Sequence, residues 1–173
     1  MMLQTARLTL RRAVMADADA LHQVMRNPAA MRYWSTLPHA DLAMTERWLA
    51  RSLARNGALS AEFVIVMGDQ VIGTAGGDTL PSVGMILHPD HWEKGLATEA
   101  MGVVIAHIFA TFPVDHLTAD VDPRNMASLA LLARLGFVPT GRATSTFLLG
   151  TEWCDSIYLT LTRDVWLQRS IGP

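Results

Sequence analysis

The sequence contains a single cysteine, Cys154, among its 173 residues. One thiol cannot close a disulfide within the chain, so the fold does not depend on an oxidising compartment. Positive charge is not in excess either, because 14 Lys and Arg stand against 16 Asp and Glu, for a formal net charge of −2. This balance argues against a nucleic-acid-binding protein that relies on a strong basic field.

Long apolar runs are also missing. The most apolar stretch, 100–112, carries His107 and is too short to cross the ~30 Å hydrocarbon core of a bilayer. The first residues show no basic segment that leads into an apolar one, so we expect no secretory signal peptide. No low-complexity tract, internal repeat or Pro/Gly-rich linker divides the chain. We therefore expect one cytoplasmic domain over residues 1–173, a monomer or homodimer, with neither nucleic acid nor membrane as a partner.

The chain does have ample material for a core, since 50% of its residues are hydrophobic and only 17% are charged. Alternating and β-branched runs predict strands, and helical spacing of apolar residues predicts helices. We expect strands at 7–11, 62–67, 70–74, 82–87, 117–121, 146–149 and 156–162, and helices at 17–26, 41–57, 94–111 and 127–135. This order of elements predicts an α+β domain with mixed strand pairing.

Local turn and cap signals support these boundaries. Gly68-Asp69 between two β-branched runs predicts a tight hairpin. Asp17 and Asp41 are expected to begin the first two helices. Gly136 is expected to end a later helix in the left-handed conformation, with Phe137 folding back as its hydrophobic contact.

The segment 85–100 carries the most information about chemistry. A strand leads through a short loop into a helix whose first turn holds Gly95 and Ala97. A helix N-terminus attracts anions, and small residues allow a phosphate to approach the backbone. The pattern thus predicts a pyrophosphate site, although close helix–sheet packing would explain the same two residues. Neither the phosphate loop of NTPases nor the dinucleotide fingerprint is present.

The run Trp92-Glu93-Lys94-Gly95-Leu96-Ala97 resembles the Gln/Arg-x-x-Gly-x-Gly/Ala signature of the GNAT superfamily of acyl-CoA-dependent N-acyltransferases. Trp92 departs from the usual Gln or Arg. Residues 94–100 are nevertheless similar to the ribosomal-protein N-terminal (RimJ/RimL-type) acetyltransferase branch. A second element, Asn125-Met126-Ala127-Ser128 followed by Leu-Gly-Phe at 135–137, resembles the family's Asn-x-x-Ser … Leu-Gly-Phe pattern. The resemblance covers about residues 7–161.

The resemblance implies the GNAT fold, with a mostly antiparallel seven-stranded sheet, fourth and fifth strands that splay apart, and about four helices. It implies an acetyl-CoA-dependent N-acetyltransferase in which a primary amine attacks the thioester directly. The acceptor would be a protein or peptide N-terminus or a small monoamine, and acetyl-CoA would be the co-substrate, with no metal. The alternative is a degenerate GNAT domain that binds acyl-CoA as a sensor or interaction module.

The resemblance also assigns contacts to the coenzyme. Backbone groups of Met85, Ile86 and Leu87 would pair with the pantetheine arm and the acetyl oxygen, although plain core-strand packing explains the same residues. Asn125 would bond to the same arm, and a helix cap explains it equally. N–H groups of one continuous run would wrap the pyrophosphate: Glu93, Lys94, Gly95, Leu96, Ala97 and Thr98. For the Lys94 side chain, ordinary surface exposure is an alternative.

The acid and the base differ from the family pattern. Many relatives protonate the departing thiolate with a tyrosine where this chain has Leu132. In the ribosomal-protein branch a serine is the substitute candidate, so the resemblance implies Ser128 as the general acid. Ser82 stands where relatives often carry a glutamate base. Asp78, His88, Asp120 and Glu152 remain unranked as bases. His88, His91, Asp90 and Glu93 show no known metal-ligand spacing, so we expect no metal site.

The acceptor site is expected to involve Tyr33, Trp34 and His39, because the loop between the first two helices covers this site in the family. Burial of Trp34 as a loop anchor is an alternative. The hairpin near 148–150 is expected to flank the same opening. Trp153 and Asp155 match a Trp/Tyr-x-Asp pattern of the branch, in which Asp155 would be structural. Because few acidic residues lie in these segments, we expect a monoamine, foremost a peptide α-amine, rather than a polycation.

Overall fold

The computed structural model describes residues 1–55 and 59–170. Within them, a five-stranded antiparallel sheet has the order β1-β2-β3-β4-β5, and a three-stranded antiparallel sheet has the order β6-β8-β7. The strands are β1 (Met2–Gln4), β2 (Thr9–Arg11), β3 (Phe63–Met67), β4 (Gln70–Gly76), β5 (Gly84–Leu87), β6 (His116–Val121), β7 (Val138–Leu149) and β8 (Glu152–Thr162).

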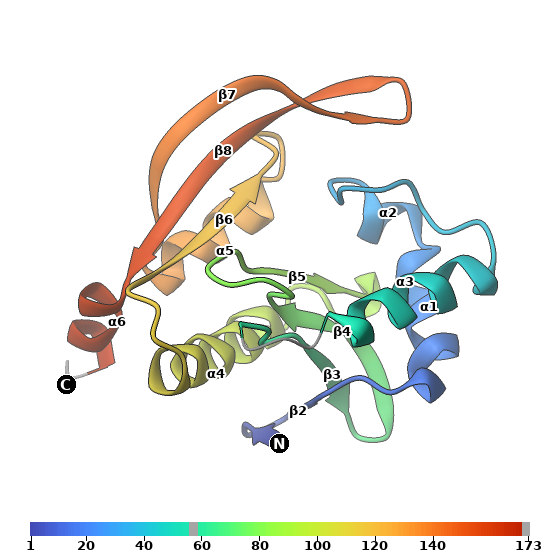
Figure 1. The fold of residues 1–173 in the computed structure, drawn as a ribbon, viewed down its shortest axis with the longest axis horizontal. Helices are drawn as coiled ribbons and strands as arrows, with labels where there is room; N and C mark the ends of the chain where they lie inside the picture. Colours follow the sequence, from blue (N-terminus) through green and yellow to red (C-terminus); the bar gives the residue numbers. More distant parts are fainter. Residues whose placement is uncertain (56–58, 171–173) are drawn as a thin grey trace.

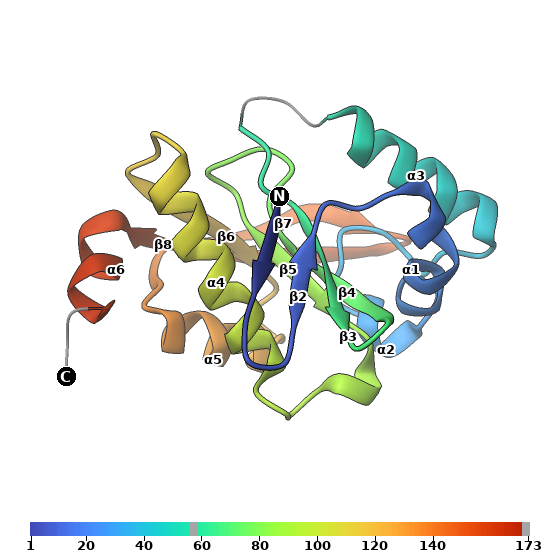
Figure 2. The same cartoon turned by 90° about the horizontal axis from the view of Figure 1, so that it is seen from below.

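Helices cover both faces of the larger sheet (Figure 1, Figure 2). The helices of the described residues are α1 (Ala18–Met25), α2 (Pro28–Met31), α3 (Leu42–Ala54), α4 (Leu96–Thr111), α5 (Met126–Leu135) and α6 (Arg163–Ser170), with short 3-10 turns η1 (Met15–Asp17) and η2 (Pro89–His91). In the described residues, no helix is both long enough and apolar enough to cross a membrane.

Strand alternation divides the hydrophobic core between the two faces of the sheet. Phe63 and Ile65 of β3 belong to the large core that includes the buried side of α4, such as Val104. The residue between them, Val64, packs instead with Leu21 of α1 and with α3. The sheet is therefore buried on both faces, with α4 on one side and α1 to α3 on the other.

The two sheets meet at β5 and β6 and then separate. A parallel bridge joins Ser82 to Thr118, and the Val83 N–H donates to the Thr118 carbonyl at 2.9 Å. Beyond this bridge each strand is the edge of its own sheet (Figure 1). This confirms the predicted splay between the fourth and fifth strands, which correspond to β5 and β6.

Three of the local turn and cap signals are confirmed, those at Gly68, Asp41 and Gly136. Gly68, with φ of +61°, turns β3 into β4, where Met67 pairs with Gln70. The Asp41 carboxylate caps α3 by accepting from the Met44 N–H at 2.7 Å. Gly136 ends α5 at φ of +96°, and the Phe137 N–H returns to the Leu132 carbonyl at 3.0 Å.

Several elements differ from the sequence expectation. β1, α2 and α6 were not predicted, and β7 begins at Val138 rather than 146, because irregular register after Pro139 and Ala143 hides its alternation. Asn27 does not only end α1, since its side chain also caps α2 by accepting from the Ala29 and Ala30 N–H groups. The Asp17 side chain makes no cap bond to α1; its carboxylate accepts from the Val14 N–H at the start of η1, at 2.8 Å, and binds the Arg11 guanidinium at 2.7 Å.

Candidate active site

The turn before α4 has the backbone shape of an anion site. Gly95 is the N-cap of α4 and has φ of +76°, and Glu93 has φ of +58°. Left-handed residues in such a turn direct successive N–H groups toward one concave side, and the first helical turn leaves its own N–H groups without internal partners. A Cβ atom on Gly95 would have only the Arg7 Nη2 atom nearby, at 3.5 Å. The turn is thus open on its concave side.

Glu99 anchors this turn to the start of the chain. Its carboxylate accepts hydrogen bonds from the Thr5 hydroxyl at 2.5 Å and from the Arg7 backbone N–H at 3.0 Å, 92 residues away in sequence. The Thr5 hydrogen bond and the Arg7 contacts lower the pKa of Glu99. Arg7 also donates to the Lys94 carbonyl at 2.8 Å. The sequence alone does not predict these contacts of Thr5 and Arg7 with the turn, because they join segments far apart in the chain.

Two side chains hold the loop, one against the end of β5 and one against η2. The Trp92 Nε1 donates to the Leu87 carbonyl at 2.9 Å. Lys94 Nζ donates to the Asp90 carbonyl at 2.6 Å. The ammonium of Lys94 is therefore held at the loop itself, with further N–H groups left to donate.

Beyond the bridge, a gap separates β5 from β6. Only every second residue of β5 directs its backbone N–H and C=O groups toward this gap. The Val83 N–H bonds across to β6, and the Leu87 carbonyl faces the same way toward Trp92. The Ile86 carbonyl instead faces β4, where a Cβ on Gly73 would lie 2.0 Å from it. Met85 and Leu87 therefore present backbone groups to the gap, whereas Ile86, predicted to do so, pairs with β4 and buries its side chain.

Across the gap, the first turn of α5 brings Asn125 and Ser128 together. The Asn125 Oδ1 accepts from the Ser128 N–H at 3.1 Å, so the capping interpretation of Asn125 is confirmed. The cap uses the amide oxygen, and the amide NH₂ group remains a separate donor. Ser128 is half-buried.

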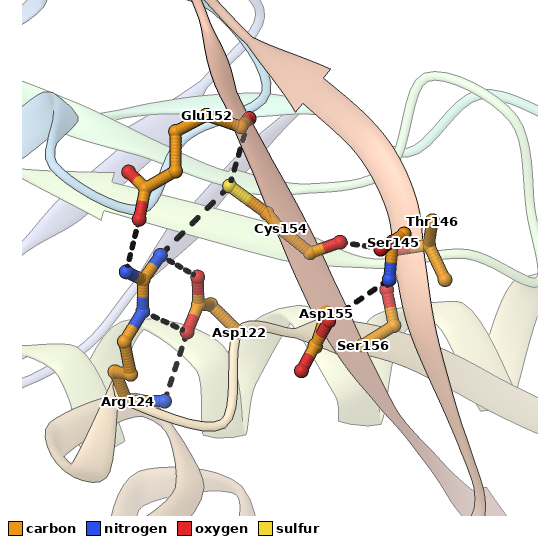
Figure 3. Close-up of polar contacts among 8 residues, drawn as sticks. All are labelled: Asp122, Arg124, Ser145, Thr146, Glu152, Cys154, Asp155 and Ser156. Carbon is orange, nitrogen blue, oxygen red and sulfur yellow. Dashed lines mark hydrogen bonds and ion pairs between the residues drawn. The ribbon is translucent and has the colours of Figure 1, made fainter.

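Arg124 fixes the turn that precedes α5 (Figure 3). Its guanidinium binds Asp122 at 2.6 Å and Glu152 of β8 at 2.5 Å. The hydrogen bond from Arg124 lowers the pKa of Asp122 and outweighs its burial. Arg124 also lies 5.8 Å from the centre of the Tyr33 ring. This arginine connects the α5 turn, the β7–β8 hairpin and the loop after α2.

Asp155 supports an irregular segment of β7, as its expected structural role requires. Its carboxylate accepts from the backbone N–H of Ser145 at 2.9 Å, and Ser145 has φ of +52° (Figure 3). Next to it, the hydroxyl groups of Thr146 and Ser156 are hydrogen-bonded at 2.7 Å. Asp155 thus holds the bulge that bends the hairpin.

A cavity of about 420 Å³ opens on the α1–α3 side of the sheet, next to the start of the β5–β6 gap. This volume lies within the range of small-molecule sites. Its lining combines the loop after α2, one side of α3 and the ends of β4 and β5: Trp34, Ser35, Thr36, Trp48, Arg51, Ser52, Arg55, Glu62, Thr74, Gly76, Gly77, Asp78, Ser82, Val83 and Gly84. It is the candidate acceptor cavity.

Two carboxyl groups line the acceptor cavity, in different states. Asp78 is paired with Arg55 at 2.8 Å. Glu62, directly before β3, receives a hydrogen bond from the Ser52 hydroxyl at 2.6 Å. Burial raises the pKa of Glu62, and the hydrogen bond from Ser52 opposes this effect only in part. Of the two carboxyl groups, Glu62 is therefore the one whose pKa is shifted upward, toward neutral pH.

Of the residues predicted to line the acceptor site, the structure places only some at the cavity. Trp34 lines the cavity, whereas Tyr33 lies outside it beside Arg124. His39 is buried, with its Nδ1 2.8 Å from the Thr45 hydroxyl, and burial lowers its pKa. The hairpin tip does not line the cavity; a Cβ on Gly150 would lie 3.5 Å from Leu37 instead. The wall expected from the hairpin comes from α3.

Of the four unranked base candidates, Asp78 alone lines the acceptor cavity. His88 accepts from the Asp90 N–H at 3.3 Å in η2, and Asp120 is exposed on β6. Glu152 is paired with Arg124. Glu62 is not among the predicted site residues, although a lone carboxylate at the head of an apolar strand is a signal that could have marked it. Among the described residues, no group of three or more His, Cys, Asp or Glu could hold a metal ion.

Comparison with known proteins places this geometry in context. Residues 7–138 match the family model described as acetyltransferase (GNAT) domain. The uncharacterized N-acetyltransferase p20 of Bacillus licheniformis is 32% identical over 148 residues, which cover 80% of this chain and 83% of that protein.

Solved structures share the same architecture. The ribosomal-protein-S5-alanine acetyltransferase from Vibrio fischeri superposes with a TM-score of 0.80 at 25% identity, over 96% of this chain and 98% of that one. The spermidine N-acetyltransferase from Vibrio cholerae, solved with CoA and spermine, gives a TM-score of 0.80 at 21% identity, over 94% of this chain and 99% of that one.

Proposed function

This chain belongs to the acetyltransferase (GNAT) family and is an acetyl-CoA-dependent N-acetyltransferase, and we propose that its acceptor is a primary monoamine, foremost a peptide α-amine. The observation that carries the acceptor proposal is the balanced charge of the acceptor cavity. Arg51 and Arg55 line it together with Glu62 and Asp78. One of these carboxylates is already paired, and the other has a raised pKa.

The described residues fit coenzyme A. The open turn at Gly95 offers N–H groups to a pyrophosphate, and the edge of β5 at Met85 and Leu87 offers alternating donors and acceptors to the amides of a pantetheine arm. Asn125, at the start of α5, is proposed to bond to the same arm through its amide NH₂ group. Acetyl-CoA in this position supplies the thioester carbonyl that the amine attacks.

A polyamine or aminoglycoside would need several carboxylates to balance its charges. Exposed single ion pairs contribute only about 0–1 kcal/mol each, so one free carboxyl does not select a polycation. An α-amine has a pKa of about 7.7–8.0, which leaves a useful neutral fraction near pH 7 to 8. The S5-alanine enzyme acts on such an amine, as its name states, and the spermidine enzyme on a polyamine. The cavity charge favours the first kind of acceptor for this chain.

Rates with a panel of acceptors test this proposal. We expect N-terminal peptides to give a kcat/KM at least about tenfold above that of spermidine or an aminoglycoside, because a tenfold ratio needs only ~1.4 kcal/mol of discrimination. Release of free thiol from acetyl-CoA measures each rate. Faster acetylation of spermidine than of every peptide would contradict the proposed acceptor class.

Ser128 is proposed to protonate the departing thiolate. Ser128→Ala removes that proton donor and is expected to lower kcat by about 10²-fold, the lower range for general acid catalysis, with acetyl-CoA binding largely kept. Because the cap uses the Ser128 backbone N–H and not its hydroxyl, α5 should keep its start. Unchanged kcat in this variant would show that water supplies the proton.

A further inference from the structure

We propose that Glu62 is the general base that activates the acceptor amine, and that a path between two glycines connects its carboxyl to the edge of β5. This inference rests on the proposed function and identifies the missing base of the same site. It assigns to the residue directly before β3 a function that the resemblance placed at position 82, shortly before β5.

The register of the sheet places Glu62 in a row with Gly76 and Gly84. The Ala61 N–H donates to the Gly77 carbonyl at 2.8 Å, and Phe63 pairs with Ala75. Glu62 therefore lies opposite Gly76, and Gly76 pairs in turn with Gly84 of β5. Residues in one row across an antiparallel sheet direct their side chains to the same face.

The two glycines leave this row open. A Cβ on Gly76 would lie 1.9 Å from the Ala61 carbonyl oxygen, so this position admits only glycine. A Cβ on Gly84 would meet nothing within 4 Å. Glu62, Gly76 and Gly84 all line the acceptor cavity. No side chain of the row therefore stands between the Glu62 carboxyl and the strand edge.

Ser82 and Gly84 are two residues apart on the segment that leads into β5, and both line the acceptor cavity. A carboxylate at 82 and one at 62 would thus reach the same cavity from opposite sides of β4. At position 82 the small serine side chain leaves space in the cavity. The Glu62 carboxyl can occupy that space and act as the base.

The surroundings of Glu62 suit a base. The Ser52 hydroxyl holds Oε2 at 2.6 Å, which leaves the second carboxylate oxygen for the amine. Four charged side chains face this region: Arg12, Arg51, Arg55 and Asp78. Burial raises the pKa of Glu62 most, Asp78 raises it further, and Arg12 and Arg55 oppose this. A carboxylate with a raised pKa is a better proton acceptor near neutral pH.

The proton balance of the reaction is simple. The Glu62 carboxylate takes one proton from the ammonium form of the acceptor, directly or through one water. The neutral nitrogen forms the C–N bond, the C–S bond breaks, and the thiolate takes a proton from Ser128 or water. The acylated nitrogen loses a second proton, which replaces the one that Ser128 or water gave to the thiolate. Glu62 passes the first proton to solvent, so that one proton in all is released for each acetyl group transferred.

Glu62→Gln tests this inference through the pH profile. We expect kcat to fall by about 10²-fold or more, as for loss of a general base, and the acidic limb of the kcat/KM profile to disappear. Ser82→Glu in the same variant returns a carboxylate to the cavity. It should bring kcat back to at least about a tenth of the wild-type value, with an acidic limb of its own in the pH profile. Glu46→Gln, an exposed glutamate of α3, is the matched control and should leave both unchanged.

A second readout does not depend on turnover. In protein labelled with ¹³C at glutamate carboxyls, the signal that Glu62→Gln removes should titrate above the ordinary glutamate pKa, because burial dominates there. An ordinary midpoint, or a Glu62→Gln variant with wild-type kcat and pH profile, overturns the inference. Wild-type protein that acetylates no amine contradicts the proposed function itself, so the two failures are distinguishable.

Discussion

Gly95→Glu is expected to weaken coenzyme A binding about 100-fold or more, since like charges in contact cost several kcal/mol and each ~1.4 kcal/mol is a factor of ten. The side chain would enter the open turn before α4, where the first N–H groups point. The φ of +76° at this residue adds a penalty for any side chain. Calorimetric titration with coenzyme A measures the change.

Two matched variants separate charge from strain and from helix stability. Gly95→Asn keeps the position neutral, and asparagine tolerates left-handed backbone better than most residues, so its binding should lie closer to wild type. Gly102→Glu adds the same charge within α4, at a position where a Cβ meets nothing within 4 Å. Unchanged coenzyme A affinity in a folded Gly95→Glu variant would place the pyrophosphate elsewhere.

Gly84→Leu is expected to lower kcat/KM for the acceptor by about 10²-fold. A loss of this size is typical when a reacting group is displaced by ~1 Å. The leucine would fill the path between Glu62 and the β5 edge. The fold should tolerate it, because the space next to Gly84 is open and its φ lies outside the left-handed region. Initial rates at varied acceptor concentration, with thermal unfolding in parallel, measure both effects.

Gly84→Ala provides the graded control, with a smaller side chain and a smaller expected loss. KM for acetyl-CoA should change little in either variant, because the added atoms lie on the α1–α3 face of the sheet. Full acceptor activity in a folded Gly84→Leu variant would show that the amine does not use this path.

The sequence predicted those parts of the site that depend on neighbouring residues. The turn at Gly95, the cap at Asn125 and the stop at Gly136 each follow from chemistry within a few positions, and the structure contains all three. The splay of β5 from β6 came from the resemblance, since strand spacing alone does not specify where two sheets part.

The acceptor cavity could not be predicted in the same way. Glu62 gains its place only when β3, β4 and β5 pair in one register, and its neighbour Ser52 comes from a helix on the same face. Tyr33 and Trp34 are adjacent in sequence, yet one contacts Arg124 and the other lines the cavity. Which neighbour points inward depends on tertiary packing and not on residue type.

Mass spectrometry of an N-terminal peptide incubated with the protein and acetyl-CoA tests the central claim most directly. The account predicts one acetyl group on the peptide α-amine, formed in equal amount with free coenzyme A thiol and absent when the α-amine is blocked. Coenzyme A binding without any acetylated amine, or thiol release without acetylated product, would contradict it.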